Sequence, residues 1–167
     1  MNKKKIYVIT LMVFLMFLIV CMKNLFINDI RKVAISNNNI EKFDVYLLRE
    51  GKYKVSLPVG WEIDDNSNSY ININFNDGND IYGNISITNG DIETICNDIA
   101  INKDDIKIVE DDSTWHIINK EKDNTINKYY LRDYSEGKVL MIKYSYIKGK
   151  EKNSINVVFD SISKSFQ

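Results

Sequence analysis

The N-terminal segment, in which three lysines precede a long apolar run, constrains this chain more than any other feature. Lysines occupy positions 3–5, residues 6–22 contain no charged side chain, and Lys23 follows the run. The run is close to the shortest that crosses the hydrocarbon core of a bilayer, which takes about 20 residues. A buried helix of a soluble domain would have a polar face, whereas Tyr7 and Thr10 are the only polar interruptions here. The sequence therefore predicts a membrane-spanning helix.

The positive charge ahead of the run predicts how this helix is oriented. Lysine-rich flanks stay on the cytoplasmic side of a membrane, so we expect the N-terminus in the cytoplasm and everything after the run outside it. The chain is then a single-pass protein of the cell membrane with three parts. These are an anchor at residues 1–23, a stalk at residues 24–42 and an extracytoplasmic domain at residues 43–167.

The stalk sequence predicts a helix followed by a flexible joint. Phe26, Ile30 and Val33 recur at helical spacing. The run Ser-Asn-Asn-Asn at residues 36–39 is typical of a helix end. We expect the chain to bend there, between the anchor and the domain.

The anchor has three alternative fates, of which retention is favoured by its length and flanks. Cleavage as a signal peptide requires a small-x-small site, which is missing. The sequence Leu-Ile-Val-Cys at residues 18–21 is similar to a lipobox, so acylation of Cys21 is the main alternative, although Val20 stands where a small residue is usual. A type IV pilin would carry a glutamate early in the apolar run and a small residue at its processing site, and neither is present.

The charge balance argues against nucleic acid as a partner. The chain has 22 Lys and Arg residues against 23 Asp and Glu residues. Four basic residues and no acidic residue lie in the first 23 positions, so the remainder has 18 basic and 23 acidic groups, a net charge of −5. An acidic domain is repelled by phosphate backbones and by anionic lipid. Cys21 lies in the anchor and Cys96 in the domain, so no internal disulfide is expected.

The domain sequence contains segments with the period of strands and segments with the period of helices. Strands are expected at residues 43–49, 53–57, 71–75, 81–88, 105–111, 114–120, 126–134 and 138–146, and helices at residues 91–99 and 154–166. Gly78 and Gly137 mark tight turns between consecutive strands. Residues 139–142 are apolar at every position, which predicts a central strand covered on both faces. The pattern predicts an α+β fold, an antiparallel β-sheet flanked by helices.

Two segments of the domain resemble the PsbP/Mog1/DcrB-like superfamily. Residues 53–61 read Tyr-Lys-Val-Ser-Leu-Pro-Val-Gly-Trp, which is similar to the opening strand of these domains, and residues 159–166 resemble the end of their last helix. The resemblance covers residues 43–167. It implies a sheet flanked by helices that serves as a binding or assembly module, in proteins that scaffold membrane complexes, bind small GTPases or sit on the cell envelope as lipoproteins. These proteins share no catalytic motif, so the resemblance implies no active-site residue.

The residues needed for common catalytic and metal sites are scarce in the domain. His116 is the only histidine and Cys96 the only thiol, so they form the single conceivable nucleophilic pair. Cys96 falls on the apolar side of its helix, where a thiol is inert. A zinc site needs more Cys and His residues, and the calcium-like spacing of Asp64, Asn66 and Asn68 lacks the Gly and Glu of an EF-hand loop. We therefore predict no enzymatic activity, no cofactor and no metal.

Aromatic residues are the candidate binding residues. Trp61 follows Pro-x-Gly, and we expect its ring to cover the edge of the core rather than to act as an exposed binding residue. The densest aromatic group consists of five tyrosines, which either pack within the sheet or line a face that binds protein or glycan. They are Tyr129, Tyr130, Tyr134, Tyr144 and Tyr146.

These observations predict a membrane-anchored, extracytoplasmic module without catalytic activity. Its expected partner, besides the membrane itself, is another envelope protein, which it binds or helps to assemble into a membrane complex. The alternative is an acylated lipoprotein that binds a small ligand or a glycan at the cell envelope.

Overall fold

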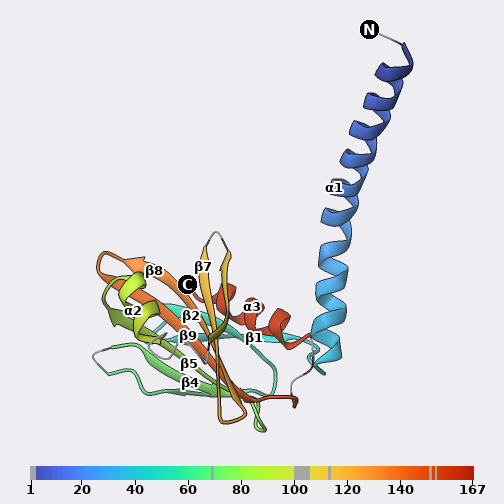
Figure 1. Ribbon diagram of the computed structural model, residues 1–167. Coiled ribbons are helices and arrows are strands. Elements are labelled where there is room, and N and C mark those ends of the chain that lie inside the picture. Colours follow the sequence, from blue (N-terminus) through green and yellow to red (C-terminus); the bar gives the residue numbers. More distant parts are fainter. Residues whose placement is uncertain (1–2, 69, 100–105, 113, 151, 153) are drawn as a thin grey trace.

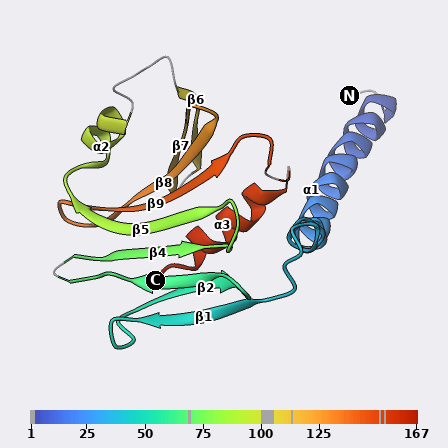
Figure 2. The same ribbon diagram turned by 90° about the horizontal axis from the view of Figure 1, so that it is seen from below.

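The fold is α+β, with one long N-terminal helix that stands out from a domain of antiparallel sheets and two short helices (Figures 1 and 2). The computed structural model describes residues 3–68, 70–99, 106–112, 114–150, 152 and 154–167. The elements are α1 (Lys3–Asn37), β1 (Phe43–Leu48), β2 (Tyr53–Pro58), β3 (Glu62–Asp65), β4 (Asn72–Asn76), β5 (Tyr82–Asn89), α2 (Ile92–Ile99), β6 (Ile106–Asp112), β7 (Trp115–Lys122), β8 (Thr125–Ser135), β9 (Lys138–Ile147) and α3 (Ile155–Ser165).

Helix α1 runs without interruption from the apolar segment into the predicted stalk. It contains 35 residues, which is about 50 Å at 1.5 Å per residue, and it is long and apolar enough to cross a membrane. The side chains of residues 6–20 are exposed, so no part of the domain covers them. The helix ends at Asn37, and Asn39 has a positive φ of 60°. The Asn-rich run therefore ends the helix as predicted.

The main sheet has seven antiparallel strands in the order β3-β4-β5-β9-β8-β7-β6. Strand β9 lies at its centre, and Val139, Leu140 and Ile142 are fully buried. Helix α3 covers one face of the sheet and α2 covers part of the other, where it packs on Ile118, Leu131 and Val139. The prediction of a central strand covered on both faces is confirmed.

Strands β1 and β2 form a separate two-stranded sheet beside α3 (Figure 2). Val55 and Leu57 of β2 are fully buried and belong to the same core as the inner face of α3. On its other side, β2 exchanges two backbone hydrogen bonds with the end of the chain, between Lys54 and Gln167 at 3.0 and 3.1 Å. The strand pattern alone predicted these two strands but not their separation from the main sheet.

The last turns of α1 are held on α3 by side-chain hydrogen bonds. Arg31 Nη2 donates to Ser161 Oγ at 2.9 Å, and Asn38 Nδ2 donates to Ser154 Oγ at 2.9 Å. The residues that were expected to form a flexible joint thus bond to the domain. This contact sets the position of α1 relative to the sheet and creates the pocket described next.

Candidate binding pocket

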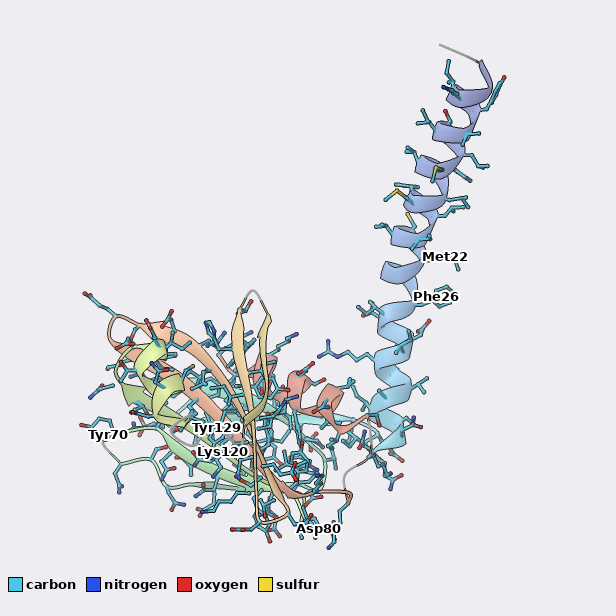
Figure 3. The ribbon with its side chains drawn as sticks, in the orientation of Figure 1. Met22, Phe26, Tyr70, Asp80, Lys120 and Tyr129 are labelled. Carbon is cyan, nitrogen blue, oxygen red and sulfur yellow. The ribbon has the colours of Figure 1, made fainter. Side chains whose placement is uncertain are left out.

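A pocket of about 230 Å³ lies where the end of α1 meets one end of the main sheet. We call it the junction pocket. It is lined by Asn38, Asn39, Ile40, Trp61, Asp77, Asn79, Asp80, Ile81, Tyr146, Ile147, Lys150, Lys152 and Ile155. These residues come from the segment just after α1, the β2–β3 connection, the turn between β4 and β5, and the end of β9 with its connection to α3. Figure 3 shows Asp80 at the end of the domain that lies beside the foot of α1.

The buried residues of the junction pocket are apolar. Ile40, Tyr146 and Ile155 are 9%, 7% and 4% exposed. Trp61 is half-buried, and its ring stacks on Phe75 with centroids 6.0 Å apart and an interplanar angle of 24°. Trp61 therefore covers the edge of the core, as predicted, and also faces the pocket.

One side of the rim is a turn whose shape is set by its own side chains. Asp77 Oδ1 accepts hydrogen bonds from the backbone N–H groups of Asn79 and Ile81, both at 2.9 Å. Asn76 Oδ1 accepts one from the N–H of Gly78 at 2.8 Å, and Gly78 takes the positive φ of 77° that the sequence predicted. Short polar side chains that bond to the backbone in this way hold a turn in one conformation. This side of the pocket is therefore preformed.

The rest of the rim carries charge. Lys150 Nζ lies 2.9 Å from Asp80 Oδ1, and both side chains are about half exposed, at 55% and 42%. An exposed ion pair contributes only about 0–1 kcal/mol, so a ligand can displace it at little cost. Lys152 Nζ donates a hydrogen bond to Asn37 O at 2.5 Å and so connects the pocket rim to α1.

The arrangement is suited to binding and offers little for catalysis. An apolar interior with amide, carboxylate and ammonium groups at its rim fits an apolar group that is attached to a polar backbone. The volume is below the roughly 300–1,000 Å³ of sites for drug-sized ligands, and is close to that of one large side chain. Among the residues that the structure describes, the lining contains no Cys, His, Ser or Thr, and both aspartates already bond to other groups.

Trp61 and Tyr146 were predicted as candidate binding residues, but the pocket that contains them was not predicted. Its other residues lie in connections that are distant in sequence; Asn38 and Ser154, for example, are 116 positions apart. The Asp77-Gly78-Asn79 turn was the only local indication, because its residue types define a rigid backbone that can present side chains.

The five tyrosines do not make one exposed face, because three of them are buried in the core. Tyr130, Tyr144 and Tyr146 are 1%, 0% and 7% exposed and belong to the core, whereas Tyr134 is exposed and Tyr129 is only half-buried. Consecutive residues of a strand point to opposite faces, so Tyr129 and Tyr130 never share one. The three buried tyrosines pack within the core, which is the first of the two expectations drawn from the sequence.

Cys96 and His116 both lie on the side of the sheet that α2 covers. Cys96 is half-buried and packs in the apolar cluster under α2. His116 stands opposite Leu131 in the register of β7 and β8, so it faces the same side. Its neighbours Trp115 and Ile117 are buried on the α3 side, which confirms the predicted alternation. Packing accounts for the position of Cys96.

The side chains with calcium-like spacing bond to neighbouring protein groups. No group of three His, Cys, Asp or Glu side chains that could hold a metal ion is found among the residues that the structure describes. In the calcium-like segment, Asn66 Nδ2 donates to Asp64 Oδ2 at 2.6 Å, and Asn68 O accepts a bond from Arg49. These contacts are those of a polar surface turn.

Cys21, the candidate for lipidation, lies inside the continuous helix α1. Acylation at this residue would follow removal of the preceding 20 residues. The remaining chain would still include Arg31 and Asn38, which bond to Ser161 on α3 and to Ser154 just before it.

Comparison with known proteins gives weak structural similarity. No family model matches the chain, and no curated protein matches it. A crystal structure from Bacteroides thetaiotaomicron VPI-5482 matches with a TM-score of 0.48 and 10% sequence identity, over 74% of this chain and 47% of that one. The chain thus spans about half the length of that protein, and a similarity at this level carries no argument about function.

Proposed function

We propose that this protein is a membrane-anchored, extracytoplasmic binding module that takes an apolar side chain of another envelope protein into the junction pocket. It acts without catalysis, as a receptor or as an assembly factor for a membrane complex. The observation that carries the proposal is the composition of the pocket. Its interior is apolar and includes Trp61, its rim is charged, and it lies directly beside the helix that enters the membrane.

The size of the junction pocket supports a protein partner. A pocket of about 230 Å³ holds one large apolar side chain, and single aromatic or aliphatic residues buried in such pockets supply most of the free energy of many protein interfaces. The charged and amide groups around it match the backbone and polar side chains that flank such a residue. A half-exposed tryptophan at the rim is the residue type most enriched in these sites.

We infer that the domain belongs to the PsbP/Mog1/DcrB-like superfamily. Support comes from strand β2 followed by Gly60 and Trp61, whose ring packs on the core, and from the closing helix α3 with Phe166 buried after it. A sheet with a helix on each face is also what this superfamily implies. Its members are binding and assembly modules, in agreement with the proposed function.

Site-specific photocrosslinking in intact cells tests the proposal. A photoreactive amino acid placed at Asn79, on the rim, should give one predominant adduct with an envelope protein, and the same residue placed at Tyr70 should not. Tyr70 is exposed and lies at the opposite end of the domain in Figure 3. Trp61→Ala should lower the yield of the Asn79 adduct at least tenfold, whereas Tyr70→Ala should leave it unchanged. Equal adducts from both positions, or none, would contradict a specific pocket.

The alternative function, an acylated lipoprotein with a small ligand, rests on the Leu-Ile-Val-Cys sequence at residues 18–21 and on the small size of the pocket. Mass spectrometry of the mature N-terminus separates the two. A retained segment before Cys21 rules out the lipoprotein, and a mature chain that begins with a diacylated Cys21 rules out the uncleaved anchor.

A further inference from the structure

The part of α1 that follows the apolar run carries an uncovered apolar stripe. Phe26, Ile30 and Val33 are 50%, 67% and 60% exposed, although they lie beyond Lys23, where the run ends. They are separated by four and three residues, which places them on one line along the helix. We call these three residues the stalk stripe.

The stalk stripe faces away from the chain's own domain. Arg31 bonds to α3 and Ile35 packs against the core of the domain, and they lie about 130° and 170° around the helix axis from the stripe, at 3.6 residues per turn. Figure 3 shows Met22 and Phe26 projecting from α1 on the side opposite the domain. Helix α1 is thus two-sided outside the apolar run: one side holds the domain, and the other exposes apolar residues.

We propose that the stalk stripe pairs with the stalk stripe of a second copy of this chain, so that the protein is a parallel dimer held together along α1. The inference rests on the proposed membrane insertion of an uncleaved α1. Insertion aligns all copies in the same direction and at the same height, so each stripe residue meets its own equivalent across a two-fold axis. The 4-3 spacing is that of the seam of a parallel coiled coil.

Charge and geometry favour a second copy over other occupants. The stripe residues are all apolar and match themselves, Arg31 and Lys32 lie about 130° around the helix from them, and Asp29 borders the stripe. Because the domains sit on the far sides of the two helices, pairing brings no part of the acidic domains together. Anionic lipid, in contrast, would have to accept the stripe beside an acidic domain.

Disulfide cross-linking in proteoliposomes that contain only this protein tests the pairing. Cys21 and Cys96 are first replaced by Ala, and an N-terminal tag verifies that α1 is retained and inserted. A cysteine is then placed either on the stripe, by Ile30→Cys, or off it, by Lys32→Cys; both positions are exposed. Under mild oxidation, the Ile30→Cys chain should form the linked dimer at least tenfold faster than the Lys32→Cys chain.

A second pair of variants tests whether the stripe itself causes the association. Phe26→Ser together with Val33→Ser should slow cross-linking through Ile30→Cys at least tenfold, while Asn28→Ser together with Lys32→Ser, at exposed positions off the stripe, should not change it. Equal rates for the stripe and control positions, with the tagged helix inserted, would overturn the proposal. So would an Ile30→Cys thiol that neither cross-links nor reacts with a membrane-impermeant maleimide, because lipid would then cover the stripe. Loss of the tag or of insertion would instead contradict the proposed anchor.

Discussion

Tyr144 on β9 is fully buried, yet its hydroxyl group has two partners on α3. The hydroxyl donates to Phe159 O at 3.1 Å and lies 2.8 Å from Ser163 Oγ, while its ring stacks on that of Phe159 with centroids 4.1 Å apart. Tyr130 bonds to the same helix through Asp160 Oδ1 at 2.6 Å. Hydrogen-bonded polar groups inside a core fix how its parts fit together. These tyrosines determine where α3 lies on the sheet.

Removal of this hydroxyl should weaken the domain. Tyr144→Phe keeps the ring but leaves Ser163 Oγ with one partner fewer in a buried site, so we expect a loss of about 1–2 kcal/mol in the free energy of unfolding. Urea denaturation of the full chain in detergent measures it. Tyr70→Phe is the matched control, since Tyr70 is exposed, and it should change stability by less than about 0.5 kcal/mol. Equal stability of the two variants would show that the bonds contribute nothing.

The same residue should make the domain sensitive to alkali. Burial raises the pKa of Tyr144 far above its ordinary value of 10.0, so the folded chain keeps the phenol protonated while the unfolded chain ionises it. The stability that depends on a protonated Tyr144 is fully present below pH 10. As the pH rises above 10, the free energy of unfolding falls by up to about 1.4 kcal/mol per pH unit. Denaturation curves between pH 8 and 11.5 should show a shallower decline for Tyr144→Phe than for the wild type. If the stability of both proteins falls equally with pH, Tyr144 is not the group responsible.

At the scale of elements, β4 and β5 pack so closely that one position requires glycine. Phe75 stands opposite Gly83 in their register, and a Cβ atom on Gly83 would lie 2.0 Å from Cε2 of the Phe75 ring. The ring therefore rests directly on the backbone of β5. There it also meets Trp61 and Tyr144, with centroids 6.0 and 5.8 Å away. This contact connects the rim of the junction pocket to the core.

Gly83→Ala should push the Phe75 ring out of place and destabilise the domain by about 1–3 kcal/mol, as overpacking of a core does. Thr88→Ala, at an exposed position of the same strand, controls for the change in strand propensity. Thermal unfolding of both variants gives the comparison. Addition of Phe75→Leu to Gly83→Ala should restore part of the loss, and if it does not, the steric explanation is wrong.

Local pattern was enough to predict most elements but not their assembly. The strands and helices of the domain follow from periods of two and 3.6, because each buries one side. Strand β3 was missed because its sequence, Glu-Ile-Asp-Asp, has a single apolar residue, Ile63, which is only half-buried. The place of the β1–β2 hairpin outside the main sheet and the junction pocket involve contacts such as Lys54 with Gln167 and Asn38 with Ser154, which join residues more than 100 positions apart. No local period carries that information.

At the scale of the whole molecule, the proposed orientation makes the three lysines at positions 3–5 decisive. In a chain whose two cysteines are replaced by Ala, Tyr70→Cys should react with a membrane-impermeant maleimide in intact cells, because Tyr70 is exposed on the domain. Replacement of the three lysines by Glu should reduce this labelling severalfold, with recovery after the cells are opened. Labelling that appears only in opened cells for both versions would place the domain in the cytoplasm.

Helix α3 is the last element of the domain, yet it contacts elements near the start of the chain, and this affects how the domain folds. Ser165 on α3 accepts a hydrogen bond from the N–H of Ser56, 109 positions earlier, and Ser161 bonds to Arg31, 130 positions earlier. Contacts between such distant residues form late and slowly, because a long loop must close before they stabilise anything. The core is incomplete until α3 has been synthesised, because Val158, Phe159 and Ile162 form part of it. A polypeptide that must be threaded through a narrow translocation channel before it folds benefits from this delay.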